Sequence, residues 1–495
     1  MNGKKRWTLH RLHKWAGLIA GVWLAVLGIS GLLLDHRHDW RWLWQSTVAA
    51  DWLPEDVIVK ARTGVWRLYQ IHPHDKNRQI VGGPQGLWWT ANDGTFWKQT
   101  RFAHSNGIPS VNTALIVERS HQLELWLATD DGIWLSKDFG QSAQAVGLTG
   151  ENITSLTQGH VATILLGVRN RSRVFQFDTS DQTHRWLELA NLRKDSLPHE
   201  INLSRWVHDL HFGRGFLYGP LDFWINDFTG AALLLLPLTG FLFWYLPKRW
   251  REQKPQGPAP ATKKHTMRTL LRTHSSITGI VLCIPILYLA ITGIFLDHGK
   301  ELRQWLKSTA IPQNWQTPVY AMHTWDKEIY AIAAYPNAPQ HISLGTRLGL
   351  FTTHNLGKTW HREASVNGFV WTLKRIGNTL FLGGMGAPNR LLRNGTWHIA
   401  KGSGHMPTDV TQDTNGVWHW INAKSVMRGG LNEAYVKTDI SFPIGTDIPW
   451  YYVLDALHSG MLFTPHWKWV NDAFALLAVF LVISGLTRWW RTKWV

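Results

Sequence analysis

The sequence predicts an integral membrane protein of mixed α and β class, in which four transmembrane helices carry a large all-β region. Three observations lead to this prediction. The 495-residue chain has a mean hydropathy of only −0.17, yet its apolar residues gather in four separate runs. Basic and aromatic residues flank these runs, as they do at membrane interfaces. The long stretches between them alternate short apolar or aromatic runs with Gly, Asn and Asp, a pattern typical of strands and turns.

The four apolar runs have the length of membrane spans. Each is close to the roughly 20 residues that cross the hydrocarbon core of a bilayer. The fourth run is the shortest, but Trp467, Trp469, Trp489 and Trp490 flank it as an interfacial belt would. For any single run the alternative is a buried core helix. The predicted spans cover residues 15–34, 228–246, 277–296 and 470–486.

Lysine and arginine predict the orientation of the spans, because cytoplasmic segments carry an excess of them. Both termini and the central loop are therefore expected in the cytoplasm. A Pro-rich stretch at 253–262 reads as a linker between two halves. The first run is long and charged residues follow it directly, which favours an uncleaved signal anchor. The basic residues are Lys4, Lys5, Arg6, Arg11 and Lys14, then Lys248, Arg249, Arg251, Lys254, Lys263, Lys264, Arg268 and Arg272, and finally Arg488, Arg491 and Lys493.

These assignments divide the chain into seven segments. Spans with their cytoplasmic flanks or linker alternate with two β-rich blocks that are expected in the periplasm. The segments are 1–36 (N-terminus and first span), 37–220 (first β-rich block), 221–247 (second span), 248–273 (linker), 274–298 (third span), 299–467 (second β-rich block) and 468–495 (fourth span and C-terminus).

The two halves of the chain repeat the same motifs in the same order, which indicates duplication. Because each half crosses the membrane twice, both halves enter from the same side. The predicted bundle is thus two parallel two-helix repeats, related by an axis along the membrane normal. The matched motifs are Ser30-Gly31 with Thr292-Gly293, Asp35-His36 with Asp297-His298, Asp209-Leu210-His211 with Asp455-Ala456-Leu457-His458, Asn226-Asp227 with Asn471-Asp472, and Thr239-Gly240 with Ser484-Gly485.

The repeat singles out three pairs of histidines among the 25 in the chain: His13 with His274, His36 with His298, and His211 with His458. Imidazole is a strong axial ligand of haem iron, and a b-type haem takes two histidines from facing helices. The single cysteine, Cys283, lies in an apolar run, which excludes a CxxCH haem attachment, an iron–sulfur cluster and a cysteine zinc site. For any one histidine the alternative is an interfacial side chain bonded to headgroups or backbone, but repetition favours haem ligation by the set.

The predicted ligands divide between the two sides of the membrane. His13 and His274 begin the first and third spans on the cytoplasmic side, whereas the other four histidines are expected on the periplasmic side. Such a chain could hold two haem groups and carry electrons across the bilayer. Which periplasmic histidines pair stays open. The role of Asp35 and Asp297 also stays open, since each could bind an imidazole or lie at a solvated helix end. The Ser/Thr-Gly pairs could serve helix packing or allow close approach of a porphyrin.

The motifs around the spans resemble those of the PepSY-associated transmembrane helix family. The resemblance lies in the pattern His10-Arg11-Leu12-His13-Lys14-Trp15-Ala16-Gly17, and in Leu210-His211-Phe212-Gly213 and Leu457-His458-Ser459-Gly460 before the second and fourth spans. Members are bacterial inner-membrane proteins, often iron-regulated, and some are haem-containing reductases that release iron from ferric siderophores. The resemblance implies an inner-membrane oxidoreductase of this kind, with the six histidines as haem ligands. No convincing PepSY domain lies between the spans.

The sequence also indicates which electron donor and acceptor the protein would use. Gly383-Gly384-Met385-Gly386 lacks the strand–turn–helix context of a dinucleotide site, so neither flavin nor nicotinamide is expected and the electron donor would be quinol or a separate protein. The acceptor would be a ferric siderophore or a periplasmic partner protein. The net charge of +17 could indicate nucleic acid, but the basic flanks of the spans explain it.

The alternative function is a non-enzymatic, membrane-anchored sensor or binding protein. A metal transporter is disfavoured because the spans lack acidic residues.

The β-rich blocks contain turn motifs like the Asp boxes of β-propellers. Residues 349–360 form the clearest copy, 132–142 a close one, and 86–97 a looser one. In such boxes Asp or Asn and Gly form the turn while Trp packs behind it, so the motif is structural. Whether both blocks combine into one propeller or form two sheets is left open by the sequence.

Overall fold

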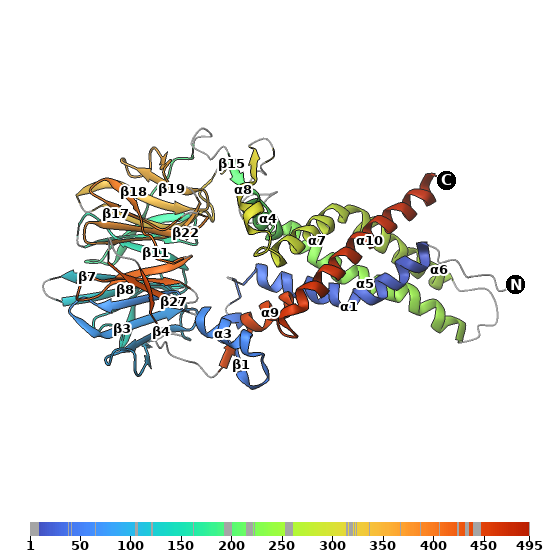
Figure 1. Cartoon of the computed structure of the whole chain (residues 1–495), viewed down its shortest axis with the longest axis horizontal. Helices are drawn as coiled ribbons and strands as arrows, with labels where there is room; N and C mark the ends of the chain where they lie inside the picture. Colours follow the sequence, from blue (N-terminus) through green and yellow to red (C-terminus); the bar gives the residue numbers. More distant parts are fainter. Residues whose placement is uncertain are drawn as a thin grey trace.

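The computed structural model contains long helices at one end and β sheets at the other (Figure 1). The basic N-terminal residues Lys4, Lys5 and Arg6 and most of the predicted linker at 253–262 lie outside the described residues. The structure describes residues 9–37, 39–40, 42–64, 66–103, 107–119, 122–161, 163–192, 200–213, 221, 223–252, 261–312, 315, 320, 322, 324–335, 337–366, 368–386, 388–404, 406–422, 425–430, 435–438 and 447–494.

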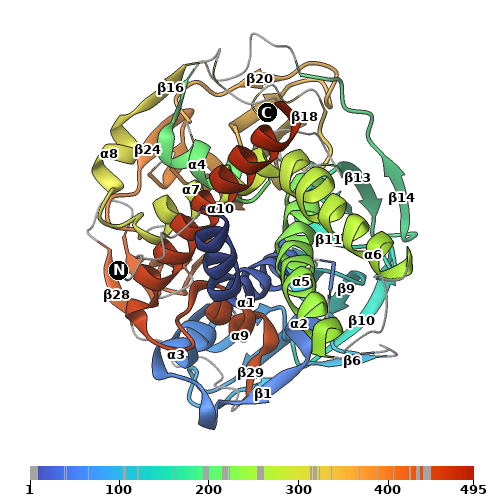
Figure 2. The same ribbon diagram turned by 90° about the vertical axis from the view of Figure 1, so that its right-hand side faces the viewer.

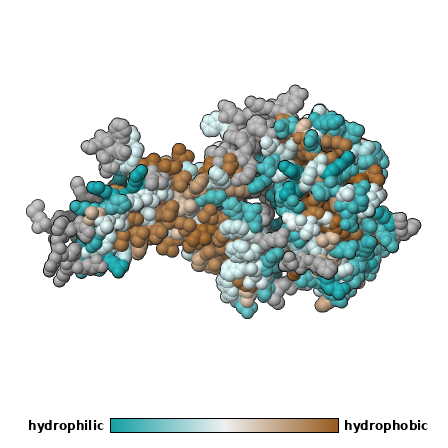
Figure 3. All heavy atoms as spheres, turned by 180° about the vertical axis from the view of Figure 1, so that it is seen from behind, coloured by the Kyte–Doolittle hydropathy of each residue, from teal (hydrophilic) through white to brown (hydrophobic). Residues whose placement is uncertain are grey.

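Three helices in the described part of the chain are long and apolar enough to cross a membrane. They are α1 (Leu9–Asp35), α5 (Trp224–Glu252) and the stretch Pro465–Trp490, most of which belongs to α10 (Lys468–Trp494). Their outer surface forms a hydrophobic band between the hydrophilic helix ends and the β region (Figure 3). Such a band contacts the acyl chains of lipid, so the chain is a membrane protein.

The third predicted span is not one straight helix over 277–296. Instead α6 (Ala261–Leu271) leads into a π-helix, η4 (Arg272–Ile280), and α7 (Cys283–Asp297) follows at an angle of 59°. Pro285 has no N–H, so it cannot bond to the carbonyl of Val281, and the helix breaks at that point. A fourth crossing exists only if this bent pair counts as one span.

The long helices pack in a pattern that repeats between the halves. In the first half α1 packs on α5, and in the second half α7 packs on α10, while α1 also contacts α10. Two short helices insert at the end nearer the sheets: α4 (Leu203–His211) packs on α7, and α9 (Trp450–Ser459) packs on α1. Three more short helices are α2 (Trp42–Gln45), α3 (Glu55–Gly64) and α8 (Arg303–Ser308).

The β region contains six larger sheets in the described residues, and three belong to the first half. Neighbouring strands are antiparallel, except that β6 runs parallel to β10. The first-half sheets are β2 (Leu68–His72), β3 (Asp75–Gly83), β4 (Gly86–Thr90) and β5 (Lys98–Gln99); β6 (Arg101–Ala103), β10 (Ser142–Gly147), β9 (Gly132–Ser136), β8 (Gln122–Thr129) and β7 (Val111–Arg119); and β11 (Ile153–Gln158), β12 (Ile164–Arg169), β13 (Arg173–Asp178) and β14 (Thr183–Trp186).

The second half supplies three four-stranded sheets, and two short sheets link distant segments. The larger sheets are β17 (Ile329–Tyr335), β18 (Ala338–Thr346), β19 (Gly349–Thr353) and β20 (His361–Arg362); β21 (Phe369–Ile376), β22 (Thr379–Met385), β23 (Arg390–Arg393) and β24 (Thr396–Ile399); and β25 (Pro407–Gln412), β26 (Trp418–Asn422), β27 (Ser425–Gly429) and β28 (Val436–Thr438). The two-stranded sheets pair β1 (Thr47–Ala49) with β29 (Asp447–Pro449), and β15 (Glu200–Asn202) with β16 (Ala310–Pro312).

The sheets of the two halves pack against each other rather than forming two separate units. Along the chain each larger sheet contacts the next through one edge strand, namely β2, β7, β11, β17, β21 and β25 in turn, so that β11 of the first half contacts β17 of the second. The last sheet returns to the first, because β25 contacts β2. At this contact the backbone N–H of Tyr69 donates to Asp409 Oδ2 at 3.0 Å. Seen along the helices, the sheets lie behind the helical part and extend beyond its outline (Figure 2).

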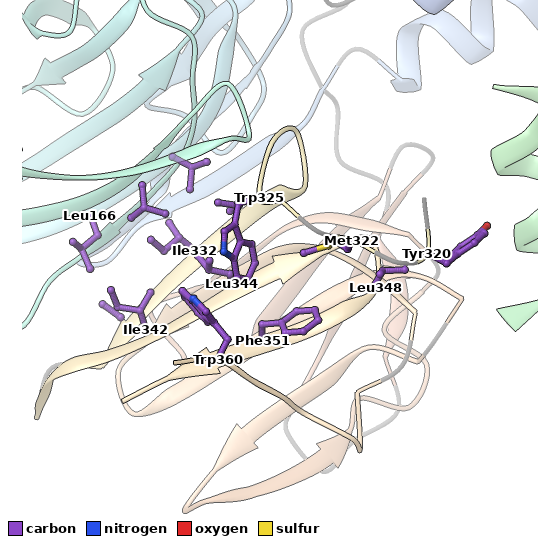
Figure 4. Close-up of a cluster of buried hydrophobic side chains, with 14 residues drawn as sticks. Leu166, Tyr320, Met322, Trp325, Ile332, Ile342, Leu344, Leu348, Phe351 and Trp360 are labelled. Carbon is purple, nitrogen blue, oxygen red and sulfur yellow. The ribbon is translucent and has the colours of Figure 1, made fainter. Parts of the chain in front are cut away.

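A buried cluster of aromatic and aliphatic side chains joins the halves at β12, β13 and β17. Leu166 and Val174 of the first half pack with residues of the second half, including Trp325, Phe351 and Trp360 (Figure 4). The Trp325 and Trp360 rings lie 4.8 Å apart between centroids. Trp325 also donates from Nε1 to the carbonyl of Ala190 at 2.9 Å, so it links the halves by packing and by a hydrogen bond.

The three Asp-box motifs form turns between consecutive antiparallel strands. The copy at 349–360 joins β19 to β20, the copy at 132–142 joins β9 to β10, and the copy at 86–97 joins β4 to β5. In the clearest copy Gly357 N–H donates to Thr353 Oγ1 at 3.0 Å, and Thr359 N–H donates to Asn355 Oδ1 at 2.9 Å. The copies at 132–142 and 86–97 make corresponding bonds through Asp138 and Asn92. These side chains stabilise the turns, as the sequence pattern predicts.

Replacing Trp325 by alanine should destabilise the β region by about 3–5 kcal/mol, because the change leaves a cavity at the junction of the halves. Thermal unfolding of the full chain, followed by circular dichroism, measures the effect. Trp315→Ala is the matched control, since Trp315 is 69% exposed and should change the unfolding temperature little. Equal effects of the two substitutions would contradict the assignment of the junction.

Candidate functional site

Four of the six predicted histidines are held in the same way by the long helices of the two halves. The Nδ1 atom of each lies within hydrogen-bond distance of the hydroxyl of a Ser-Gly or Thr-Gly pair in the other half of the chain. The bonds join His13 to Ser484 (2.7 Å), His274 to Thr239 (3.0 Å), His211 to Thr292 (3.0 Å) and His458 to Ser30 (2.8 Å).

The hydroxyl groups determine which ring nitrogen carries the proton. Ser30 Oγ donates its only hydrogen to the carbonyl of Val26 at 2.7 Å, and Thr292 Oγ1 donates to Tyr288 at 2.7 Å. Thr239 and Ser484 bond to backbone carbonyls of their own helices in the same way. A hydroxyl that has donated its hydrogen can only accept from the imidazole, so Nδ1 carries the proton. The Nε2 lone pair is then available to a metal.

The glycine of each pair lets the imidazole lie against the helix backbone. A Cβ added at Gly240 would come within 3.3 Å of His274 Cε1, and one added at Gly293 within 3.4 Å of His211 Cε1. Gly31 and Gly485 face His458 and His13 in the same manner. The hydroxyl and the missing side chain together explain why the Ser/Thr-Gly pair recurs in α1, α5, α7 and α10.

His13 and His274 face each other near the basic end of the helices. Their ring centroids are 6.3 Å apart and their planes are 87° apart. Two imidazoles that bind one metal ion through Nε2, each at about 2 Å, have ring centres roughly 6 Å apart. The observed separation therefore fits two axial ligands on a single iron.

His211 and His458 line a cavity of ≈ 300 Å³ at the other end of the bundle. Its wall is mostly apolar, with Leu27, Gly31 and Ile286 among the residues that form it. Burial, helped by His458 and His208, lowers the pKa of His211 to about 3, and burial also lowers the pKa of His458. Both rings are therefore neutral, which is the form that binds iron.

The β region and its short helices position these two histidines. Asp209, two residues before His211 in α4, accepts from Tyr320 Oη at 2.6 Å, and Asp455 in α9 pairs with Lys60. After each helix the chain turns at a glycine with positive φ, namely 70° at Gly213 and 78° at Gly460. The Asp and Gly of the repeated motifs are thus structural, because they hold the ends of α4 and α9.

His36 and His298 are not brought to the other histidines, which differs from the prediction for the six-residue set. The Nε2 atom of His36 lies 3.0 Å from Asp227 Oδ1, and that of His298 lies 2.7 Å from Asp472 Oδ2. Asp39 approaches His36 Nδ1 at 3.2 Å as well. Each ring thus binds a carboxylate within its own half, and neither lines the cavity of His211 and His458.

The neighbouring Asp35 and Asp297 each accept a hydrogen bond from an asparagine of the repeated Asn-Asp motif. Asn226 Nδ2 donates to Asp35 at 3.3 Å and to the carbonyl of His211 at 2.8 Å. Asn471 bonds to Asp297 in the second half. The repeated Asp-His and Asn-Asp motifs therefore bind each other and fasten α1 to α5 and α7 to α10.

The π-helix η4 compensates for a one-residue difference between the halves. His13 lies 17 positions before Ser30, whereas His274 lies 18 positions before Thr292. A π-helical turn accommodates an extra residue and is frequent at functional sites. His274 lies within η4, so the second half accommodates the extra residue while His274 still reaches Thr239.

A second, polar cavity of ≈ 590 Å³ lies between the helices and the β region. It adjoins the cavity of His211 and His458, because Leu34, Asp35, Arg37 and Phe212 line both. Several cations line it, a feature that the sequence analysis missed because they are scattered along the β region. They are Arg37, Arg67, Arg169, Arg171, Arg173, Lys327 and Arg347. The described residues include no group of three or more His, Cys, Asp or Glu side chains that could hold a metal ion.

The His36–Asp227 contact should stabilise the protein more at acidic than at alkaline pH. Burial lowers the pKa of His36, but Asp227 and Asp39 outweigh burial and raise it above the ordinary 6.5. The stabilisation is then fully present below the unfolded-state pKa and is lost as pH rises through the raised folded-state value. The difference in unfolding temperature between the wild type and His36→Gln should therefore be larger at about pH 5.5 than at about pH 8.5. The exposed His466→Gln is the control, and a pH-independent difference would contradict the assignment.

Known structures share with this chain only distant likeness. An ancestral GH74 enzyme matches 78% of this chain and 37% of its own (11% identity, TM-score 0.33). The extracellular domain of a hybrid two-component system from B. thetaiotaomicron matches 79% and 34% (10%, 0.35), and YCF48 bound to D1 peptide matches 68% and 74% (10%, 0.27). The chain spans about a third of the length of the first three structures matched.

The family to which the chain belongs follows from its sequence. No curated protein matches it significantly. The family described as the PepSY-associated TM region matches residues 10–492, which includes all four helix–histidine contacts. The chain therefore belongs to the PepSY-associated transmembrane family.

Proposed function

We propose that this chain is a haem-b oxidoreductase of the bacterial inner membrane, which passes electrons across the membrane and reduces a ferric chelate on the side of the β region. One observation carries the proposal. Four histidines, two at each end of the helices, have Nδ1 anchored to a hydroxyl. Their Nε2 atoms make no hydrogen bond in the described part of the chain.

In this proposal His13 and His274 hold one haem, and His211 and His458 hold a second. Haem iron with two imidazole ligands supplies one-electron transfer. His36 and His298 leave the ligand set, because their Nε2 atoms face carboxylates. On α1, His13 and Ser30 are 17 residues apart, so the two sites are separated by about 25 Å along the helix, most of the hydrocarbon thickness.

The orientation and the β architecture belong to the same proposal. Basic residues cluster at the helix ends far from the sheets, which would place those ends in the cytoplasm and the β region in the periplasm. The contacts that lead from sheet to sheet and return from β25 to β2 support a six-bladed propeller. The propeller would form a periplasmic cap on a four-helix bundle, with the bent α6–η4–α7 segment as its third span.

The electrons would come from quinol or from a separate donor protein. Oxidation of one quinol to quinone releases two protons and two electrons, which reduce two ferric ions to ferrous ions. Fe²⁺ is a softer ion and binds hard oxygen ligands less tightly than Fe³⁺ does, so reduction releases iron from its chelate. A membrane-anchored sensor or binding protein, the alternative function, would need none of the four histidines.

Protein expressed with an adequate haem supply should show a Soret band and b-type bands on dithionite reduction. His211→Ala and His458→Ala should each remove about half of the bound haem, because each replaces a ligand of one site only. The exposed His466→Ala is the matched control. Reduction of a ferric chelate, followed with a ferrous-specific chromogenic chelator, should fall in the two variants. A wild-type protein without a Soret band, or full haem content in His211→Ala, would refute the proposal.

Thr292→Val should weaken haem binding at the His211 site by about 10- to 100-fold, because valine cannot accept from Nδ1. Thr292→Ser retains the hydroxyl and should retain the affinity. The measurement is the rate of haem loss to a high-affinity scavenger protein. If valine and serine behave alike, the hydroxyl does not position the ligand.

A further inference from the structure

We infer that the polar cavity beside His211 binds a small, negatively charged ferric chelate whose carboxylate groups are held by Arg67. The assignment names the substrate class and rests on the proposed function. The cavity of ≈ 590 Å³ has the volume of a small-molecule site. It also shares wall residues with the cavity of His211 and His458, so a bound chelate would lie next to the second histidine pair.

The cationic side chains in the wall are not all compensated by protein carboxylates. Arg67 is partly buried, and its guanidinium makes no hydrogen bond or ion pair in the described part of the chain. It lies over the ring of Trp44 at 5.4 Å, and Trp44 in turn stacks on Tyr451 at 4.1 Å. Stacking fixes the guanidinium plane while its N–H edge stays available, which suits bidentate binding of a carboxylate.

Neighbouring arginines make this part of the cavity an anion site. Arg171 and Arg37 lie close enough to add to the effect of burial, which lowers the pKa of Arg67 to about 10. Arg171 stands over Tyr330 at 4.7 Å, and Arg37 stands over Tyr451 at 5.9 Å. A cation that is buried near other cations gains stability from an anionic ligand.

The acidic residues in the wall already have donors. The contacts are His36 to Asp39 (3.2 Å), Asn226 to Asp35 (3.3 Å), Ser110 N–H to Asp130 (2.8 Å), Ser172 Oγ to Asp326 (2.6 Å) and Arg347 Nε to Glu328 (3.3 Å). None of these carboxylates bonds to Arg67.

The repeat shows that Arg67 has no equivalent cation in the second half. Leu68 pairs with Gly82 in the first half as Ala331 pairs with Gly345 in the second, so the position of Arg67 is taken there by Tyr330. By the same register Pro84 stands in the position of Arg347, which pairs with Glu328. Arg67 and Tyr330 both line the cavity. The first half therefore places a cation where the second half has an aromatic ring.

Equilibrium binding to the purified full chain tests the inference, with Ga³⁺–citrate as the probe because Ga³⁺ resembles Fe³⁺ but is not reduced. The wild type should bind Ga³⁺–citrate, and Arg67→Gln should weaken binding by about 10- to 100-fold. Arg67→Lys should restore part of the loss, since the charge remains but the fork does not. Arg393→Gln is the matched control, because Arg393 is an exposed strand residue outside the cavity.

Three results would overturn the inference: an unchanged affinity of Arg67→Gln, equal binding of a neutral Ga³⁺ trihydroxamate, or equal binding of metal-free citrate. The absorption spectra of the same preparations keep this test apart from that of the proposed function. Haem-loaded protein that does not prefer the anionic chelate would refute the substrate class alone. Protein that binds Ga³⁺–citrate but holds no haem would refute the redox function and leave the anion site standing.

Discussion

The hydrogen bond from an imidazole Nδ1 to a helix hydroxyl in the other half of the chain is the interaction on which the candidate site depends. It occurs four times, and in each case the hydroxyl has already donated its hydrogen to its own backbone. The proton position on the ring is therefore set by the helix. Because His13 and His274 each need a hydroxyl from the opposite half, neither half can form a complete site alone. Duplication has here produced two interdependent halves.

The β region contributes to this arrangement through the helices that follow its sheets. α4 begins directly after β15, and α9 begins directly after β29, so the His211 and His458 positions are fixed by strands as well as by spans. Contacts of Asp209 with Tyr320 and of Asp455 with Lys60 fasten both helices to distant parts of the chain. The packing of the sheets of both halves at the Trp325 cluster thus also determines how α4 and α9 lie relative to each other.

The sequence predicted three apolar helices long enough to span a membrane, the repeated motifs and the Asp-box turns, because each depends on residues close together in the chain. It could not separate His36 from His211, since a histidine beside a helix end has the same local pattern whether it faces a carboxylate or a metal. The carboxylate that binds His36 lies 191 positions away. The bend before α7 was missed because Pro285 lies within an apolar run. The packing of the two β blocks against each other and the cation cluster around Arg67 are likewise long-range features.

The differences between the halves are as informative as their symmetry. Where the histidines lie, a one-residue difference is absorbed by the π-helix η4, so the geometry is retained although the sequence spacing is not. Where the polar cavity lies, the symmetry is lost, because Arg67 stands where the second half has Tyr330, and Pro84 stands where it has Arg347. In the proposed function two equivalent redox sites need matched ligands, but a single substrate between the halves needs only one binding wall. The symmetry retained at the histidines and the symmetry lost at the polar cavity both agree with that proposal.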